Sequence, residues 1–270
     1  MKKSTWIIFS AGAVLSGLYA FPFFIVVLNA FKQKREILNN PLGLPAEIQW
    51  ENFTEAIRKM EYFQALTNSI IVTVSSVGAI ILTSSMLAYY LARKKTKFSA
   101  FTFLVLVTSM IVPFQALMIP FVGFFGQLGM LGSRFWLMVF YVGFGVAMST
   151  FLYHGFISNI PRELDEAASM DGASEFRTFR TVIFPMLTPV TATVAIINAL
   201  WIWNDYLLPA LVLSEDLRTL PLRTYVFYGK YTSDYGLAMA GLVLSVVPIV
   251  IFYFLLQKRI ISGVSAGAIK

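Results

Sequence analysis

Side chains capable of catalysis are few in this chain, which has one histidine, His154, and no cysteine. A lone imidazole without a thiolate does not make a metal centre or an activated nucleophile, so we expect His154 to pack rather than react. The phosphate-binding pattern G-x-x-x-x-G-K-[ST] is absent, because the nearest match, Gly229-Lys230, has Thr224 where the first glycine belongs. We therefore expect no catalytic site, no metal and no cofactor here.

One acidic residue stands inside a long apolar segment. It is Asp205, in "WIWNDYLLPA", and the uncharged run before it begins after Arg180. If that segment crosses a membrane, Asp205 falls near its outer end, where burying a carboxylate costs less than at the centre. A carboxylate in such a place is a functional candidate by default.

A second polar feature is the stretch 163–185, "ELDEAASMDGASEFRTFRTVIFP", with five of the fourteen acidic residues. Pro161 and the acids that follow it suit the first turn of a helix. Gly172 suits the left-handed residue that ends one. A second helical segment then runs to Pro185. The sequence predicts a polar helical hairpin, which we place in a loop over 159–185.

The first helix of this hairpin places Leu164, Ala167, Ala168 and Asp171 on one face. A helix of about ten residues is marginal by itself in water, so it needs a surface to lie on. Helices that lie on lipid favour bulky apolar and basic residues, whereas this one is acidic and rich in alanine. We therefore expect a docking helix for another protein, with Glu166 and Asp171 facing basic residues of the partner.

Composition sets the class of the whole chain. With 57% hydrophobic residues, only 13% charged residues and a mean hydropathy of +0.72, it is not an ordinary soluble domain. Six uncharged runs each exceed the roughly 20 residues needed to cross a bilayer as a helix. We predict an all-α integral membrane protein, one transmembrane domain over 1–270, in which Pro113 and Pro120 kink the third span. The expected spans are 6–31, 66–92, 99–126, 135–157, 187–210 and 235–257.

Basic residues indicate the orientation. If the N-terminus is cytoplasmic, 12 of the 21 basic residues and five acids lie inside, so the inner segments hold the whole net charge of +7. The loop 159–185, the tail 258–270 and both termini are then cytoplasmic. The largest outer segment is 32–61, with a short amphipathic helix pattern at "ENFTEAIRKM". The basic character therefore reflects membrane topology, and we expect a lipid bilayer and no nucleic acid as partner.

The hairpin resembles a known signature. The pattern E-A-A, three residues, G, nine residues, I-x-L-P is the cytoplasmic-loop signature of bacterial ATP-binding-cassette (ABC) importer permeases. This chain carries it as Glu166-Ala167-Ala168, Gly172 and Pro185. It departs in having Val182 for Ile and Phe184 for Leu. The stretches "AFKQKREI" to "ENFTEAI", "WNDYLLPALVL" and "QKRIISGVSAGAIK" also resemble carbohydrate-type permeases, closest to the second permease subunit of maltose and multiple-sugar importers.

The resemblance implies what the hairpin does. The helix around Glu166 resembles the coupling helix, which seats in a cleft of a separate cytoplasmic ATPase and passes its closure to the spans. The implied coupling residues are Glu166, Ala167, Ala168, Asp171, Gly172 and Pro185. The implied partners are a second, homologous permease subunit in a heterodimer, an ABC ATPase dimer and an extracytoplasmic sugar-binding protein. The implied location is the bacterial inner membrane.

A candidate substrate path lies near Asp205. Sugars are recognised by stacking on aromatic faces and by hydrogen bonds to carboxylates or amides. The candidate contacts are Trp201, Trp203, Asn204 and Asp205. An aromatic belt at the membrane interface explains the two tryptophans equally well.

Two rival functions share parts of this pattern. The loop signature also occurs in importers of amino acids, phosphate or metal ions, but the outer segment and the tail favour carbohydrate. A secondary transporter would show several ionisable residues at mid-span, whereas this chain shows one, off centre. The expected function is the permease subunit of an ATP-driven sugar or oligosaccharide importer, and no residue indicates which sugar.

Overall fold

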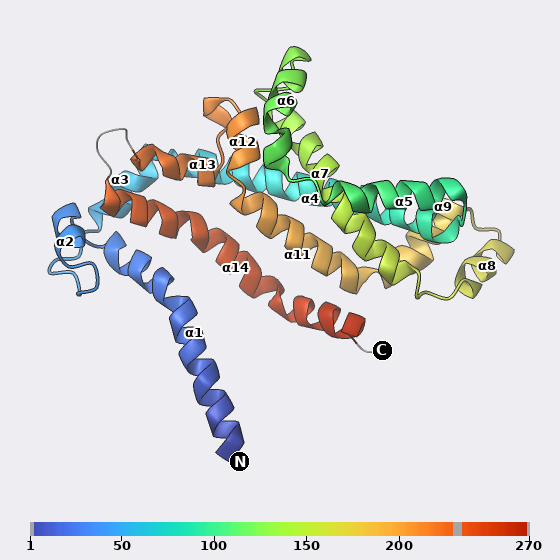
Figure 1. Ribbon diagram of the computed structural model, residues 1–270, viewed down its shortest axis with the longest axis horizontal. Helices are drawn as coiled ribbons and strands as arrows, with labels where there is room; N and C mark the ends of the chain where they lie inside the picture. Colours follow the sequence, from blue (N-terminus) through green and yellow to red (C-terminus); the bar gives the residue numbers. More distant parts are fainter. Residues whose placement is uncertain (1–2, 229–233, 269–270) are drawn as a thin grey trace. The chain divides into compact units, whose positions relative to one another are not determined.

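The computed structural model describes residues 3–228 and 234–268, with side chains described over 9–228 and 234–254. These residues form helices joined by turns and short loops, with no β-strand among them (Figure 1). The all-α class predicted from the sequence is therefore confirmed. The chain divides into two compact units, residues 1–66 with 220–250 and residues 67–219 with 251–270.

The first unit contains the N-terminal helix and the helices around it. Its elements are α1 (Lys3–Ala30), α2 (Lys34–Asn39), α3 (Glu51–Lys59), the start of α4 (Tyr62–Arg93), α13 (Leu220–Thr224), the 3-10 turn η3 (Tyr225–Phe227) and the first half of α14 (Tyr235–Ala268). The short helix expected within 32–61 is α3. Buried Lys32 holds the segment before α3 by donating hydrogen bonds from Nζ to the carbonyls of Asn40 and Pro41, at 3.0 and 3.3 Å.

The second unit contains the polar hairpin and the segment around Asp205. Its elements are most of α4, then α5 (Lys97–Ser109), α6 (Phe114–Gln127), α7 (Arg134–Ile157), α8 (Glu163–Met170), α9 (Glu175–Thr178), the π-helix η1 (Phe179–Ile183), α10 (Phe184–Met186), α11 (Thr188–Asn204), α12 (Leu207–Val212) and the 3-10 turn η2 (Glu215–Leu217).

Among the described residues, four helical segments are long and apolar enough to cross a membrane: Phe9–Ala30, Tyr62–Arg93, Arg134–Ile157 and Tyr235–Phe254. Two bent pairs, Lys97–Ser109 with Phe114–Gln127 and Glu175–Met186 with Thr188–Asn204, bring the number to as many as six. These segments agree with the predicted integral membrane protein. The division into six spans and the cytoplasmic location of both termini stay predictions.

The third expected span, 99–126, is the first bent pair, and its two helices meet at 102°. The break falls just before Pro113, whose ring disfavours a helical conformation in the residue that precedes it. Pro113 itself is extended, with φ −71° and ψ 137°. Pro120 was also expected to kink this span, but it lies within α6.

The fifth expected span, 187–210, contains α11, and a bend of 78° at Leu187 separates α11 from the end of the hairpin. Prolines explain the bend, because Pro189 has no N–H to donate to the carbonyl of Pro185. The hydroxyl of Thr188 donates to that carbonyl instead, at 2.6 Å. The π-helix η1 precedes the bend, and such turns are rare outside sites under local strain or function.

Two apolar clusters form the core of the second unit. One includes Tyr141 and Ile202 and lies under the segment around Asp205. The other includes Tyr153, Phe179 and Ile183, and it buries the second arm of the hairpin. The hairpin is thus built into the core on one side, through its second arm.

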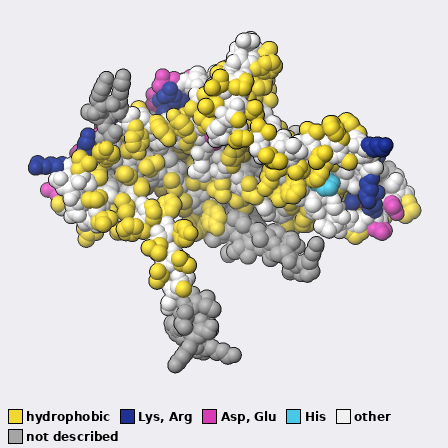
Figure 2. All heavy atoms as spheres, in the orientation of Figure 1, with side chains coloured by type: hydrophobic (Ala, Val, Ile, Leu, Met, Phe, Trp, Pro, Cys, Tyr) yellow, Lys and Arg dark blue, Asp and Glu magenta, His cyan; other side chains and the backbone are white. Residues whose placement is uncertain are grey.

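The surface agrees with a membrane environment. Large apolar side chains are exposed along α5, including Phe98, Phe101 and Leu104. Figure 2 shows hydrophobic side chains over much of the visible face, whereas in the second unit basic and acidic side chains gather where α8 and α9 lie. An apolar surface of this extent needs lipid or protein to cover it.

Candidate functional site: the polar hairpin and a cavity beside Asp205

Helix α8 ends in a turn that requires glycine. Gly172 has a φ of +77°, in the left-handed region. The N–H of Ala173 donates a hydrogen bond to the carbonyl of Ala168 at 3.0 Å, and the N–H of Gly172 donates one to the carbonyl of Ser169 at 3.0 Å. This pair of bonds is the Schellman arrangement, which satisfies carbonyls that the helix leaves open. Gly172 therefore fixes where α8 stops and α9 begins.

The two sides of α8 differ in exposure. Leu164, Asp165 and Ala168 are half-buried, and Leu164 packs against the cluster that holds Ile183. The side that points away from the protein is exposed and consists of Glu163, Glu166, Ala167, Met170 and Asp171. The face expected from helical spacing is therefore divided: Ala167 and Asp171 are exposed, but Leu164 and Ala168 face the chain's own core. Met170 is 84% exposed, unusual for an apolar side chain in a polar helix.

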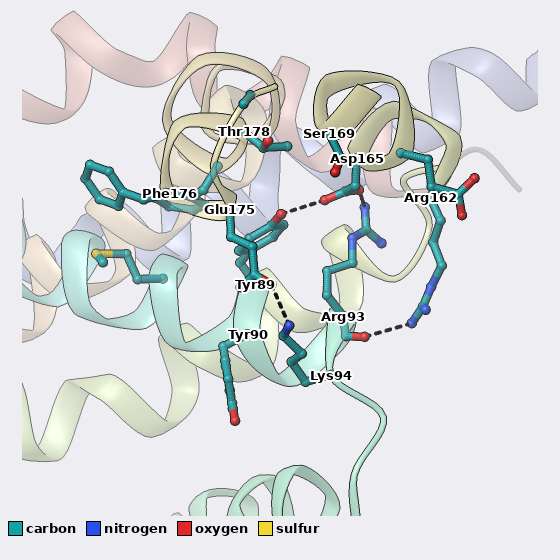
Figure 3. A pocket seen from close by; sticks show the side chains of 14 residues that line it. Tyr89, Tyr90, Arg93, Lys94, Arg162, Asp165, Ser169, Glu175, Phe176 and Thr178 are labelled. Atoms are coloured by element: carbon teal, nitrogen blue, oxygen red, sulfur yellow. Dashed lines mark hydrogen bonds and ion pairs between the residues drawn. The ribbon is translucent and has the colours of Figure 1, made fainter. Parts of the chain in front are cut away.

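Asp165 joins α8 to the last turn of α4. Its Oδ1 accepts a hydrogen bond from the hydroxyl of Tyr89 at 2.6 Å, and its Oδ2 lies 2.8 Å from Nη2 of Arg93 (Figure 3). Tyr89 and Arg93 are four residues apart, so they share one face of α4. Both carboxylate oxygens of Asp165 are thus engaged by a single neighbouring helix.

Arginines also close the ends of helices at this place. Arg93 donates from Nη1 to the carbonyls of Ile157 and Ile160, at 3.3 and 3.2 Å, at the end of α7. Arg162, which precedes α8, donates in turn to the carbonyls of Ala92 and Arg93, both at 3.2 Å. Cations are favourable at helix C-termini, where carbonyls lack partners. The ends of α4 and α7 are therefore tied to each other and to α8.

A second ion pair bridges α4 and α9. Nζ of Lys94 lies 2.5 Å from Oε1 of Glu175, and the side chains are 45% and 72% exposed. The hydrogen bond that Lys94 donates to Glu175 raises the pKa of Lys94, so the lysine stays charged at neutral pH. Exposed pairs of this kind contribute little, because water and salt screen them.

Between α4 and the hairpin lies a cleft of about 400 Å³. Its lining includes Arg93 and Asp165 (Figure 3). Glu166 of α8 also lines it. Glu166 is exposed and makes no ion pair with the residues that the structure describes. Pro185 lies at the far end of the hairpin, exposed, in α10. The chain thus holds Asp165 in place and leaves the adjacent Glu166 open.

The segment around Asp205 borders a second hollow, a cavity of about 420 Å³. Trp201 and Asp205 line it, together with Gln115 after the α5–α6 break and Asn198 of α11. The indole of Trp201 is 40% exposed and packs edge-on against Tyr141, with ring centroids 5.4 Å apart. An aromatic face, a carboxylate and two amides therefore meet at one cavity.

Asp205 also has a structural role. Its Oδ2 accepts a hydrogen bond from the hydroxyl of Tyr141 at 2.9 Å, and its Oδ1 accepts one from the N–H of Leu207 at 3.0 Å. The carboxylate thus holds the start of α12 and ties it to α7.

Of the four candidate path residues, Trp201 and Asp205 line the cavity. Trp203 is 7% exposed and belongs to the packed side of α11, and neither it nor Asn204 lines the cavity. Asn204 donates to the carbonyl of Leu200 at 2.7 Å. The structure brings Trp201 and Asp205 together and separates the other two from them. His154 packs against Phe103, with ring centroids 4.2 Å apart.

Comparison with known proteins identifies the family. Residues 80–266, which include the whole hairpin and the cavity, match the family described as "Binding-protein-dependent transport system inner membrane component". The chain belongs to this family. As an inner membrane component it is a multi-pass membrane protein, in agreement with its apolar helices.

Curated relatives of this inner membrane component match it over nearly its whole length. The probable starch degradation products transport system permease protein AmyC of Thermoanaerobacterium thermosulfurigenes is 43% identical, over 96% of this chain and 94% of its own. The multiple sugar-binding transport system permease protein MsmG of Streptococcus mutans is 37% identical, over 98% and 96%.

A solved structure shows the same fold. It is a bacterial ABC transporter involved in the import of the acidic polysaccharide alginate, with a TM-score of 0.80 and 22% identity. The match covers 96% of this chain and 98% of the other.

Sequence reasoning on this inner membrane component missed four residues of the hairpin and the cavity. Three of them are at the hairpin: Arg93 was counted only among the inner basic residues, Asp165 only among the acids after Pro161, and Tyr89 was not singled out. The i, i+4 spacing of Tyr89 and Arg93 is a signal for a shared face, but it does not reveal which segment that face contacts. Gln115 was missed too, because nothing in the sequence places it opposite Trp201.

Proposed function

We propose that this chain is the transmembrane permease subunit of an ATP-driven importer of sugars or oligosaccharides. The observation that carries the proposal is the similarity, over nearly the whole chain, to relatives named for starch degradation products and for multiple sugars. The exposed apolar helices and the polar hairpin are the features that such a subunit needs. The same relatives favour carbohydrate over amino acids, phosphate or metal ions as the transported solute.

The hairpin is the element that couples transport to ATP hydrolysis. Helix α8 presents Glu166, Ala167 and Met170 outward on a base fixed to α4 and the core, so a cytoplasmic ATPase dimer meets a rigid ridge there. Glu166 supplies an open charge for a basic residue of the ATPase, and small Ala167 lets its backbone approach closely. Asp171 and Gly172 set the end of the ridge, and Pro185 marks the bend into α11. Hydrolysis takes place on that partner chain, and this subunit is not catalytic.

The remaining partners follow from the family and from the size of the chain. A binding-protein-dependent system includes an extracytoplasmic binding protein. With at most six candidate spans, this chain supplies half of the translocation path, and a second, homologous permease subunit supplies the other half in a heterodimer. In this arrangement both termini and α8 face the cytoplasm.

The cavity beside Asp205 is the part of the path that this subunit contributes. Sugar rings stack on aromatic faces and bond carboxylates and amides, and Trp201, Asp205 and Gln115 offer these groups at one cavity. Trp203 and Asn204 act by packing and by holding the end of α11. Trp203 is buried, whereas a tryptophan of an aromatic belt lies at the membrane interface. The aromatic-belt interpretation therefore fits Trp203 poorly.

Co-purification tests the proposal. The tagged subunit is expressed in its source cell, captured with its associated chains, and reconstituted in liposomes with the binding protein. We expect an ATPase and a second permease in the complex, and ATP hydrolysis that starch-derived oligosaccharides stimulate. The subunit alone should neither hydrolyse ATP nor take up sugar. Stimulation by amino acids or phosphate and by no carbohydrate would contradict the substrate class, and ATP-driven uptake by the lone subunit would contradict the heteromeric assembly.

A further inference from the structure

We infer that Tyr89, Arg93 and Asp165, which we call the α8 anchor, make α8 and the end of α4 move as one body, so that force on α8 reaches the wall of the cavity. The inference rests on the proposed function and assigns Asp165 a role distinct from that of the neighbouring Glu166. Asp165 is a positioning residue: it transmits the movement and does not touch the ATPase.

The orientation of Asp165 supports this role. Its side chain is 19% exposed and points away from the open side of α8 towards α4 (Figure 3). Both of its oxygens are engaged, one by the hydroxyl of Tyr89 and one by Arg93. A partner that docks on Glu166 and Met170 therefore leaves the α8 anchor in place.

The α8 anchor also supplies most of the polar contacts that fix the orientation of α8. The half-buried Leu164 of α8 packs against the core cluster that holds Ile183. A short helix with so small an apolar contact is free to rock about its axis. An ion pair and a hydrogen bond to one helix, reinforced by Arg162 on the end of α4, remove that freedom.

Helix α4 continues from the α8 anchor to Ile80, which packs against Gly145 of α7 at the wall of the cavity. Ile80 lies thirteen residues before Arg93 on the same helix, which is roughly 20 Å at 1.5 Å per residue. A Cβ built on Gly145 of α7 would lie 2.6 Å from Cδ1 of Ile80 and 2.9 Å from Oδ1 of Asn198. Gly145 and Asn198 both line the cavity. Displacement of α4 along its axis therefore pushes on a contact that has no spare room.

The ion pair of the α8 anchor is more buried than the other ion pair of the cleft. The side chains of Arg93 and Asp165 are 11% and 19% exposed, whereas those of Lys94 and Glu175 are 45% and 72% exposed. Removing one member of a desolvated pair leaves a charge without a partner, but removing one member of a solvated pair does not. Glu175→Gln is therefore a matched control for Asp165→Asn in the same cleft.

The test uses the full complex in liposomes with the binding protein, and measures three quantities: ATPase retained on the permease, ATP hydrolysed and sugar taken up. In Asp165→Asn and Asp165→Ala we expect ATPase retention within about twofold of the wild type, and sugar taken up per ATP to fall at least about tenfold, since hydrogen bonds to charged groups are the strong ones. Glu175→Gln should match the wild type in all three.

Tyr89→Phe provides a second, milder variant, since it removes only a hydroxyl and does not threaten the fold. Alone it should lower sugar taken up per ATP, and in an Asp165→Ala background it should lower it no further, because the hydroxyl acts through Asp165. A merely structural tyrosine would give the same loss in both backgrounds.

Two results would overturn the inference while leaving the proposed function intact. One is wild-type uptake per ATP in both Asp165 variants. The other is loss of the ATPase from Asp165→Ala to the extent seen in Glu166→Ala, which would make Asp165 a docking residue. Absence of sugar uptake by the wild-type complex would instead refute the proposed function, and the role of the α8 anchor with it.

Discussion

The turn at Gly172 offers a sharp test of the docking role of α8. Gly172→Val places a β-branched side chain at a φ of +77°, a conformation in which such residues are outliers. Beyond the two neighbouring residues of the chain, no heavy atom lies within 4 Å of the position of the new Cβ, so the penalty is conformational and not a collision. The variant therefore changes the turn without disturbing the core.

The size of the effect follows from two limits. A left-handed backbone costs an L-residue roughly 1–2 kcal/mol. If the turn opens instead, the two Schellman hydrogen bonds are lost, at about 0.5–1.5 kcal/mol each. The protein takes the cheaper route, and docking weakens only to the extent that the opened turn is populated. When the two costs are equal, about half of the molecules keep the native turn, and when the strain exceeds the cost of opening by about 1 kcal/mol, about one in six keeps it. The apparent affinity for the ATPase should therefore fall by about two- to sixfold when only the native turn docks.

Titration of labelled ATPase onto the permease complex in nanodiscs measures this affinity, and sugar-stimulated ATP hydrolysis measures the consequence. Gly172→Asn is the first control, because asparagine tolerates the left-handed region, and it should lie close to the wild type. Gly155→Val is the second: a Cβ there also meets nothing within 4 Å, and φ is in the ordinary range. Wild-type affinity in Gly172→Val, or an equal loss in Gly155→Val, would refute the reasoning.

Two further predictions concern orientation and path. Cysteines in place of Lys95 and Ser174, convenient because the chain has no native cysteine, should react with an impermeant thiol reagent only after the membrane is opened; labelling from outside intact cells would reverse the topology. Trp201→Ala should lower sugar uptake at least about threefold with the complex still assembled, since it removes the aromatic face of the cavity and each CH₂ equivalent of apolar burial is worth about 0.8 kcal/mol. Asn204→Ala, off the cavity, should change uptake little, and equal effects of the two substitutions would contradict the assignment of the cavity.

Much of the fold was open to prediction, because its causes are local. The sequence itself shows the uncharged runs that are long enough to cross a bilayer and the glycine, Gly172, that closes the hairpin. The helical class could therefore be predicted directly. The break before Pro113 was expected as a kink, but its size was not, because proline removes one hydrogen bond and the packing of neighbours sets the angle. Pro120 shows the converse, since it is accommodated within α6.

Less of the site could be predicted, because its geometry depends on contacts between residues far apart in the sequence. Helical periodicity placed Leu164 and Ala168 on a face with Ala167 and Asp171, but which part of that face is buried depends on where the core containing Ile183 lies. The partners of Asp165 are more than seventy residues away on α4. Sequence spacing within one helix carries no information about such pairs.

Photo-crosslinking from position 170 tests the central claim most directly, namely that α8 docks on a separate ATPase. Met170 is 84% exposed at the outer side of α8, so a benzophenone amino acid fits there without repacking. Irradiation of the assembled complex should give an adduct in which mass spectrometry finds the ATPase, and the same group in place of the exposed Thr54 of α3 should give none. An ATPase adduct from position 54 and none from position 170 would contradict the account.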